Sequence, residues 1–150
     1  MTHDSVRELI ARSCLALDEE RFSDYLDLCA DDYRYRILAH STEIDREMTW
    51  LDVDRQELAA MFEMIPQHVR MQGRMRRHVS VYTVVPSVPG RLAVRSSLVV
   101  HFTNLDGETS LFAVGEFRDV VGDSAAGARL LARDVFLDTR VLGAGSHMPI

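Results

Sequence analysis

Residue spacings that mark metal centres and nucleophilic sites are missing from this sequence. None of the six histidines pairs with another at His-x3-His spacing, and the two cysteines form no Cys-x2-Cys or Cys-x-His pair. Such pairs are the usual ligand sets of zinc and iron–sulfur sites. Neither a Gly-x-Ser-x-Gly elbow nor a glycine-rich phosphate loop is present. We therefore predict no metal, no cofactor and no catalytic residue in this chain, although an iron triad of residues far apart in the sequence would leave no such spacing.

Long apolar runs and long basic runs are also missing. No stretch reaches the roughly 18 consecutive apolar residues of a membrane-spanning helix, and the first residues contain no apolar core of a signal peptide. The longest basic run is RMRR at residues 74–77, in a chain of net charge −6. These features argue against a membrane and against nucleic acid as partners. We expect a cytoplasmic protein in which Cys14 and Cys29 are buried and reduced.

What the chain does contain is an ordinary globular composition. Its 150 residues are 47% hydrophobic and 27% charged. A chain of this length buries enough surface to form one core without help from disulfides or metals. We therefore predict a single domain that spans residues 1–150.

Helical patterns come first along the chain, and strand patterns follow. Helices are predicted for residues 6–17, 22–28 and 55–64, the last of them between a capping Asp54 and a terminating Pro66. Residues 40–53 are predicted to be irregular and 67–75 to be a loop. Strands are predicted for residues 33–38, 78–85, 91–103, 108–121 and 129–142. This order indicates an α+β fold with the N-terminal helices packed on a curved antiparallel sheet.

The strands carry apolar residues on both faces. In the strand at 108–121 we place Leu111, Ala113 and Phe117 on one face and Phe112 on the other, with Gly115 as a candidate bulge that bends the sheet. The last strand is apolar on both faces. A sheet with one face in water would alternate more cleanly. We therefore predict that the mixed face is a subunit interface.

One set of residues has the chemistry of an acid–base site. A sheet that curls around helices encloses a conical cavity, and a buried histidine with a carboxylate partner moves protons near neutral pH. The candidates are Asp31, Asp32, Tyr33, Tyr35, His78 and Arg118. The structural alternative is that both aspartates cap a helix or pair with Arg34 and Arg36, and that His78 makes only structural hydrogen bonds.

The arginines of the basic run are a second candidate. A guanidinium group pairs bidentately with a carboxylate, so Arg74, Arg76 and Arg77 indicate an anion site or a contact between subunits. We take Arg76 and Arg77 as the interface candidates. The alternative is a solvated turn.

Several short motifs follow one another along most of the chain. They are LDEERFSDYL (17–26), DDYRY (31–35), RRHV (76–79), VRSS (94–97), LFAVGEFRD (111–119) and LARDVFLDT (131–139). In this order they resemble the motifs of the small (beta) subunit of Rieske-type aromatic-ring-hydroxylating dioxygenases. Residues 47–54 and 64–68 look closer to the small subunit of methanesulfonate monooxygenase, and residues 143–150 depart from the usual family ending.

The resemblance implies a fold and a role. The fold would be the NTF2-like (SnoaL-like) cone. In such oxygenases the Rieske 2Fe-2S cluster and the mononuclear Fe(II) belong to the alpha subunit, and the beta subunit is structural in an α3β3 hexamer. The resemblance therefore implies a non-catalytic subunit of an NADH-dependent oxygenase, with an alpha subunit as direct partner and a reductase or ferredoxin as indirect one. The substrate of the complex would be an aromatic compound or a small organosulfonate.

Two other hypotheses remain at this point. One is a free-standing SnoaL-like isomerase or dehydratase that uses Asp32, Tyr33 and His78, similar to scytalone-dehydratase-like lyases. The other is a ligand-binding or scaffold domain without chemistry. Only the first requires these three side chains to meet in one cavity.

Overall fold

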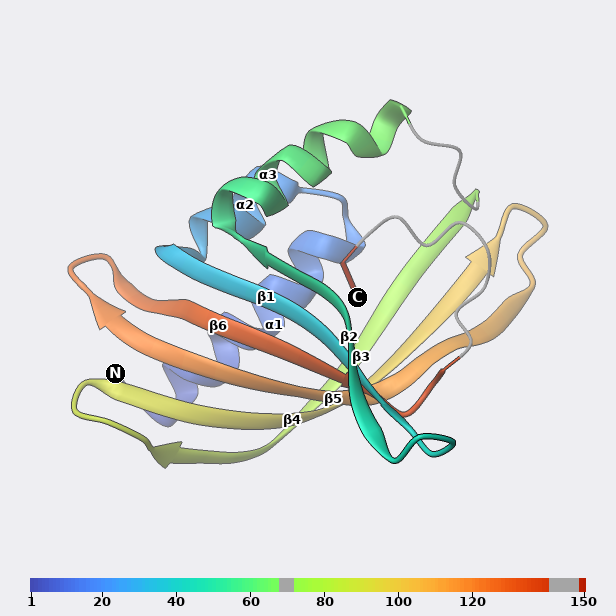
Figure 1. The fold of residues 1–150 in the computed structure, drawn as a ribbon. Helices are drawn as coiled ribbons and strands as arrows, with labels where there is room; N and C mark the ends of the chain where they lie inside the picture. The colour runs from blue at the N-terminus through green and yellow to red at the C-terminus, as the bar shows by residue number, and fades with distance from the viewer. Residues whose placement is uncertain (68–71, 141–148) are drawn as a thin grey trace.

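A six-stranded curved sheet wraps around three helices in the computed structural model, which describes residues 1–67, 72–140 and 149–150 (Figure 1). The helices are α1 (His3–Asp18), α2 (Phe22–Asp27) and α3 (Arg55–Met64), followed by a 3-10 turn at Ile65–Gln67. The strands are β1 (Cys29–Ser41), β2 (Arg46–Asp54), β3 (Gly73–Pro86), β4 (Arg91–Asn104), β5 (Thr109–Ser124) and β6 (Gly127–Leu137). The strand order is β2-β1-β6-β5-β4-β3. This arrangement confirms the predicted α+β fold with helices packed on a curved sheet.

The helix at residues 55–64 has the predicted bounds because its signals are local. The Asp54 side chain accepts a hydrogen bond from the Glu57 backbone N–H at 2.8 Å, and the Glu57 side chain accepts one from the Asp54 backbone N–H at 2.8 Å. This reciprocal pair satisfies two N–H groups that have no partner inside the helix. Leu58 and Phe62 then point into the core, where Phe62 stacks on Phe22.

Residues 40–53 form a hairpin, so the prediction of an irregular segment is wrong. β1 continues to Ser41, and β2 runs antiparallel to it from Arg46. β2 lies at the edge of the sheet and most of its side chains are exposed. An exposed edge strand lacks the apolar alternation that marks a strand in a sequence. The predicted loop at 67–75 lies partly outside the described residues, and β3 begins inside it, at Gly73.

One pair of strands is parallel, which the antiparallel prediction did not include. β1 and β6 lie side by side and run in the same direction, with Tyr35 opposite Arg133 and Ile37 opposite Val135 (Figure 1). The other four pairs are antiparallel. Because β1 and β6 are distant in sequence, no turn between them fixes their direction. The predicted last strand ends at Leu137, and its final residues, 141–142, lie outside the described part of the chain.

The bulge in β5 lies at Phe112 rather than at Gly115. The register shifts between Val100 and His101, so Phe112 is the extra residue; it is buried, while Leu111 is 59% exposed. The extra residue reverses the alternation, which is why our placement of Leu111 on the same face as Ala113 and Phe117 is wrong. Gly115 stays in register, but a Cβ there would lie 2.2 Å from the Phe136 carbonyl oxygen. Gly115 therefore allows a close approach of two strands.

The core lies between the helices and the inner face of the sheet. Ala113 and Phe117 face it, as predicted, together with buried residues of every helix. Cys14 and Cys29 are buried and unpaired. No helix among the described residues is long and apolar enough to cross a membrane.

Candidate functional site

A charged pair lies in the interior of the curved sheet. Arg133 of β6 donates to Asp119 of β5 through Nε at 2.7 Å and Nη2 at 3.0 Å, and both side chains are fully buried. Its Nη1 donates to the Ser13 hydroxyl of α1 at 3.0 Å, and its guanidinium lies 4.0 Å from the centre of the Phe117 ring. Burial by itself would lower the pKa of Arg133, but its neighbours together, Asp119 first among them, hold that pKa well above its usual value. The pair therefore links three elements with a permanent positive charge at its centre.

Three buried tyrosines lie near this pair. The hydroxyl groups of Tyr25 and Tyr33 are 2.7 Å apart, and the Tyr35 hydroxyl accepts from the Ile150 backbone N–H at 2.9 Å. Burial raises the pKa of Tyr25 and Tyr33 well above the usual range and that of Tyr35 to about 12. These phenols therefore keep their protons at neutral pH, and none of them is a base there.

The acid–base candidates do not meet in one cavity. Tyr33 faces the interior, but Asp32, its neighbour on β1, is exposed. His78 of β3 is also exposed, because Arg77 takes the inward position beside it. Successive side chains of a strand point to opposite faces, so Asp32, Tyr33 and His78 cannot act together on one substrate.

The remaining candidates of that set are also dispersed. Asp31 is exposed on β1, which begins at Cys29, so neither aspartate lies at a helix end. Tyr35 faces the interior. Arg118 is exposed on β5, where its guanidinium lies 3.9 Å from the centre of the Phe136 ring. The isomerase hypothesis therefore has no geometric support.

The two interface candidates lie on opposite faces of β3. The Arg77 side chain is fully buried; its Nη1 donates to Asp18 of α1 at 2.5 Å and its Nη2 to the Pro149 carbonyl at 2.6 Å. Asp18 also accepts from the Arg77 backbone N–H at 3.1 Å, which fastens α1 to the free edge of β3. Arg77 thus makes internal contacts that hold α1 against β3. Arg76 is exposed on the outer face.

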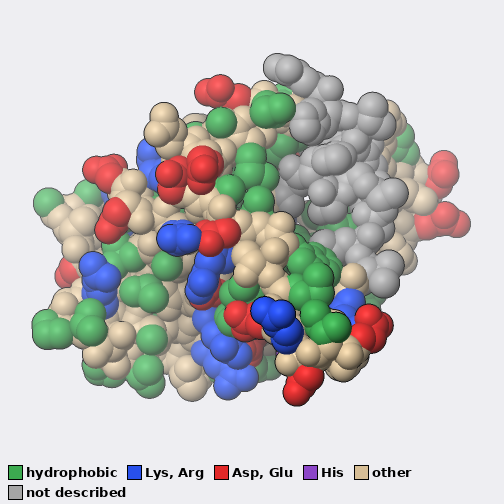
Figure 2. Space-filling model, in the orientation of Figure 1, with side chains coloured by type: hydrophobic (Ala, Val, Ile, Leu, Met, Phe, Trp, Pro, Cys, Tyr) green, Lys and Arg blue, Asp and Glu red, His purple; other side chains and the backbone are tan. Residues whose placement is uncertain are grey.

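Most charged side chains on the outer face of the other strands are paired. Arg34 pairs with Asp52 at 2.6 Å, and Arg36 pairs with Asp134 at 2.5 Å. Glu116 accepts from both Arg95 and Arg118, and these two hydrogen bonds lower its pKa against the opposing effect of burial. Figure 2 shows this face, where blue and red side chains lie beside one another over the middle of the sheet. We call these seven residues the ion-paired patch.

A different surface lies where β3, β4 and β5 meet near the β4–β5 turn. It is a hollow of about 470 Å³. The rings of its two histidines are 5.1 Å apart and edge to face, and its two threonine hydroxyls are 2.8 Å apart. We call it the basic hollow; its lining residues are Arg74, Arg76, His78, His101, Thr103 and Thr109.

Neither the interior nor the surface fits an iron site in the part of the chain that the structure describes. Within it, no group of three or more histidine, cysteine, aspartate or glutamate side chains is placed to hold a metal ion. Burial raises the pKa of the Cys29 thiol to about 12, whereas an iron–sulfur ligand must be a thiolate. The residues that the structure describes therefore do not form a site for a Rieske cluster or a mononuclear iron.

Comparison with known proteins identifies the family of this chain. A model of the ring hydroxylating beta subunit matches residues 12–144, which include every strand described above. The chain belongs to this beta-subunit family. The match confirms the family that the six motifs indicated, and the NTF2-like cone is the fold of this beta subunit.

Relatives of this beta subunit match it over nearly their whole length. The beta subunit of 2-aminobenzenesulfonate 2,3-dioxygenase from Alcaligenes sp is 35% identical over 146 residues, 97% of each chain. The beta subunit of methanesulfonate monooxygenase hydroxylase from Methylosulfonomonas methylovora is 34% identical over 98% of this chain and 86% of that one. A crystal structure from Novosphingobium aromaticivorans, described as the beta subunit of an aromatic-ring-hydroxylating dioxygenase, has a TM-score of 0.84 at 22% identity, over 98% of this chain and 95% of that one.

Sequence reasoning missed the buried pair and half of the basic hollow. Asp119 and Arg133 occupy inward positions in otherwise apolar alternation, beside Phe117 and Val135, and this was the available signal. A charge at such a position indicates a buried partner of opposite sign. No local pattern indicates that His101 and Thr109 lie beside His78, because their proximity depends on the register of three strands.

Proposed function

We propose that this chain is the structural, non-catalytic beta subunit of a multicomponent Rieske non-haem iron oxygenase. The observation that carries the proposal is the family match over residues 12–144, together with two relatives that align over 97% and 86% of their own length. The described interior is consistent with a structural role, because Arg133 is hydrogen-bonded to Asp119 and Tyr25 to Tyr33 inside the core. The direct partner is an oxygenase alpha subunit, which supplies the Rieske cluster and the mononuclear iron.

The substrate of the complex is an organosulfonate in this proposal. Two relatives at 34% and 35% identity are named for an aromatic and an alkyl sulfonate. Both names are those of beta subunits, one of a dioxygenase and one of a monooxygenase hydroxylase. The complex is α3β3, receives electrons from NADH through a reductase or ferredoxin, and works in the cytoplasm.

The contribution of this chain is mechanical. A closed hydrophobic core and a fastened edge strand hold one long sheet in a fixed shape. The two faces of that sheet differ, because the inner face packs on the chain's own helices and the outer face is available to other chains. Such a subunit stabilises an assembly without touching the reacting atoms.

Co-expression with the alpha subunit tests the proposal. The chain is purified alone and with the alpha subunit of the same oxygenase, and mass by light scattering and iron content are measured on the same fractions. We expect iron-free protein alone and an iron-containing complex many times heavier than 17.0 kDa when both are present. A stable, iron-free species whose mass is indifferent to the alpha subunit would contradict the proposal.

A further inference from the structure

The basic hollow contains arginines that lack the partners found elsewhere on the sheet. Every guanidinium of the ion-paired patch contacts a carboxylate, whereas Arg74 and Arg76 make no hydrogen bond or ion pair with any residue that the structure describes. Both belong to β3, which is an edge strand. Positive charge without a partner among the described residues therefore lies at one edge of the sheet, in a chain whose net charge is −6.

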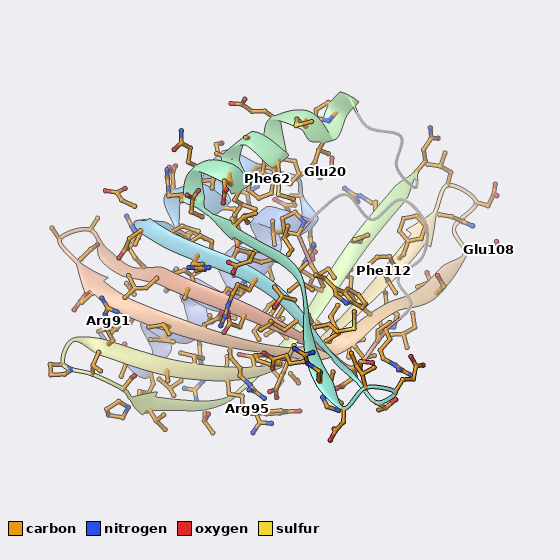
Figure 3. All side chains as sticks on the ribbon, in the orientation of Figure 1. Glu20, Phe62, Arg91, Arg95, Glu108 and Phe112 are labelled. Atoms are coloured by element: carbon orange, nitrogen blue, oxygen red, sulfur yellow. The ribbon has the colours of Figure 1, made fainter. Side chains whose placement is uncertain are left out.

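The register of the strands creates this cluster. Arg76 lies opposite His101 on β4, and Arg74 lies opposite Thr103, which in turn lies opposite Thr109 on β5. Facing residues of neighbouring strands point to the same side, so these groups converge on one volume. In Figure 3 the label Glu108 marks the turn that leads into Thr109, far from Arg91 at the other end of β4.

The donors in the hollow suit an oxyanion. Guanidinium groups, imidazole N–H groups and hydroxyls all donate hydrogen bonds to oxygen, and two adjacent guanidiniums match the two oxygens of a carboxylate. No carboxylate lines the hollow. The nearest acidic side chain in the sequence, Glu108, accepts a hydrogen bond from Asn104 at 3.1 Å. An incoming anion thus meets donors without a resident competitor among the lining residues.

An apolar residue beside the hollow indicates that the anion comes with a protein. Leu111 lies opposite His101, points to the same side and is 59% exposed. A free inorganic ion gains nothing from an exposed leucine, whereas subunit interfaces combine arginine with apolar contact. We infer that the basic hollow is an oxyanion site that a carboxylate side chain of the alpha subunit fills, with Leu111 packed against the same partner. This inference rests on the proposed function.

The first experiment tests the site on the isolated full-length chain. Sodium acetate replaces sodium chloride at constant ionic strength while the ring signals of His78 and His101 are followed by NMR. We expect a saturable shift of both histidines, weakened about tenfold or more in Arg76→Gln because one charge-assisted pair is lost. Arg91→Gln is the matched control, since it removes an exposed arginine of β4 outside the hollow. Unsaturable shifts, or equal weakening in both variants, would overturn the oxyanion site.

The second experiment tests the occupant in the complex. Affinity between the two subunits is measured for Arg76→Glu, Arg76→Lys and Arg91→Glu. We expect Arg76→Glu to weaken assembly by about 30-fold or more, because a carboxylate would then face a carboxylate at a desolvated contact. Arg76→Lys should weaken it less, and Arg91→Glu should not weaken it.

The two experiments distinguish a wrong assignment of the occupant of the hollow from a wrong assignment of the chain's function. If Arg76→Glu assembles as tightly as the unmodified chain, the carboxylate of the partner is not in the hollow. If the unmodified chain does not assemble with the alpha subunit at all, both the proposed function and the proposed occupant are wrong. Acetate binding by the isolated chain would still show whether the hollow binds an oxyanion.

Discussion

The two faces of the sheet both carry arginine, but the surroundings of the guanidinium groups differ. On the inner face Arg77 and Arg133 are fully buried, and each meets a carboxylate. On the outer face Arg36 meets one, whereas Arg74 and Arg76 meet none among the described residues. A buried arginine without a partner would cost several kcal/mol, so pairing inside the protein is a condition of folding. A missing partner on the surface costs little, and a cluster of unpaired arginines there is a better indicator of a binding surface than exposure alone.

The largest effect on stability is expected from a substitution that breaks the buried pair of Asp119 and Arg133. Asp119→Ala leaves Arg133 charged and buried, and we expect the free energy of unfolding to fall by about 3–5 kcal/mol. Urea unfolding followed by circular dichroism measures it. The double variant Asp119→Leu/Arg133→Met is the control, and it should recover most of the loss because no unpaired charge remains. If Asp119→Ala lowers the free energy of unfolding by less than about 1 kcal/mol, the buried pair contributes no more to stability than a surface ion pair does.

High pH is expected to destabilise the same buried interior. Burial raises the pKa of the Cys29 thiol from 9.0 to about 12 and that of Tyr35 from 10.0 to about 12. The unfolded chain releases these protons at a lower pH than the folded chain does. The stability that the two protonated groups contribute to the folded chain is therefore complete below pH 9 and is lost as the pH rises to 12. The free energy of unfolding should fall by up to about 1.4 kcal/mol per pH unit for each group.

Unfolding midpoints between pH 8 and 11 check this dependence. Cys29→Ala removes one of the buried groups whose pKa is raised, so its slope above pH 9 should be shallower than that of the unmodified chain. Identical slopes would mean that the Cys29 thiol ionises equally easily in the folded and the unfolded chain.

A smaller effect is expected at the ion-paired patch. Asp134→Ala removes the partner of Arg36, whose side chain is 38% exposed and regains water. We expect a loss below about 1 kcal/mol, decreasing with added salt. Urea unfolding at low and high NaCl measures it, with Asp32→Ala as a comparison, because Asp32 is exposed on β1 and makes no ion pair with any residue that the structure describes. A loss as large as that in Asp119→Ala would abolish the distinction between the two faces.

The smallest effect on stability belongs to the basic hollow. Arg76→Gln removes no ion pair within the described chain, so we expect the free energy of unfolding to stay within about 0.5 kcal/mol. Thermal unfolding of the isolated chain measures it. A clear gain in stability would sharpen the comparison further, since it would reveal repulsion between Arg74 and Arg76. A loss above about 1 kcal/mol would show that Arg76 has a structural role in this chain.

The part of the fold that local signals specify was predictable. Asp54, Glu57 and Pro66 set the ends of α3 because a cap and a proline act on their own neighbours. The strands predicted at 91–103 and 108–121 pair across a turn in which Gly107 adopts a φ of 84°. Motifs along most of the chain indicated the beta-subunit family before any contact between the strands was known.

Tertiary structure decided what depends on register and on partners distant in sequence. The parallel pairing of β1 with β6, the bulge at Phe112 and the contact of Arg77 with Asp18 each join segments whose local patterns are compatible with other arrangements. A one-residue shift moves every later side chain of a strand to the other face. For that reason the sequence by itself determined most of the elements and the family, whereas only the packed sheet determined that Arg77 is internal and that Arg76 is available to a partner.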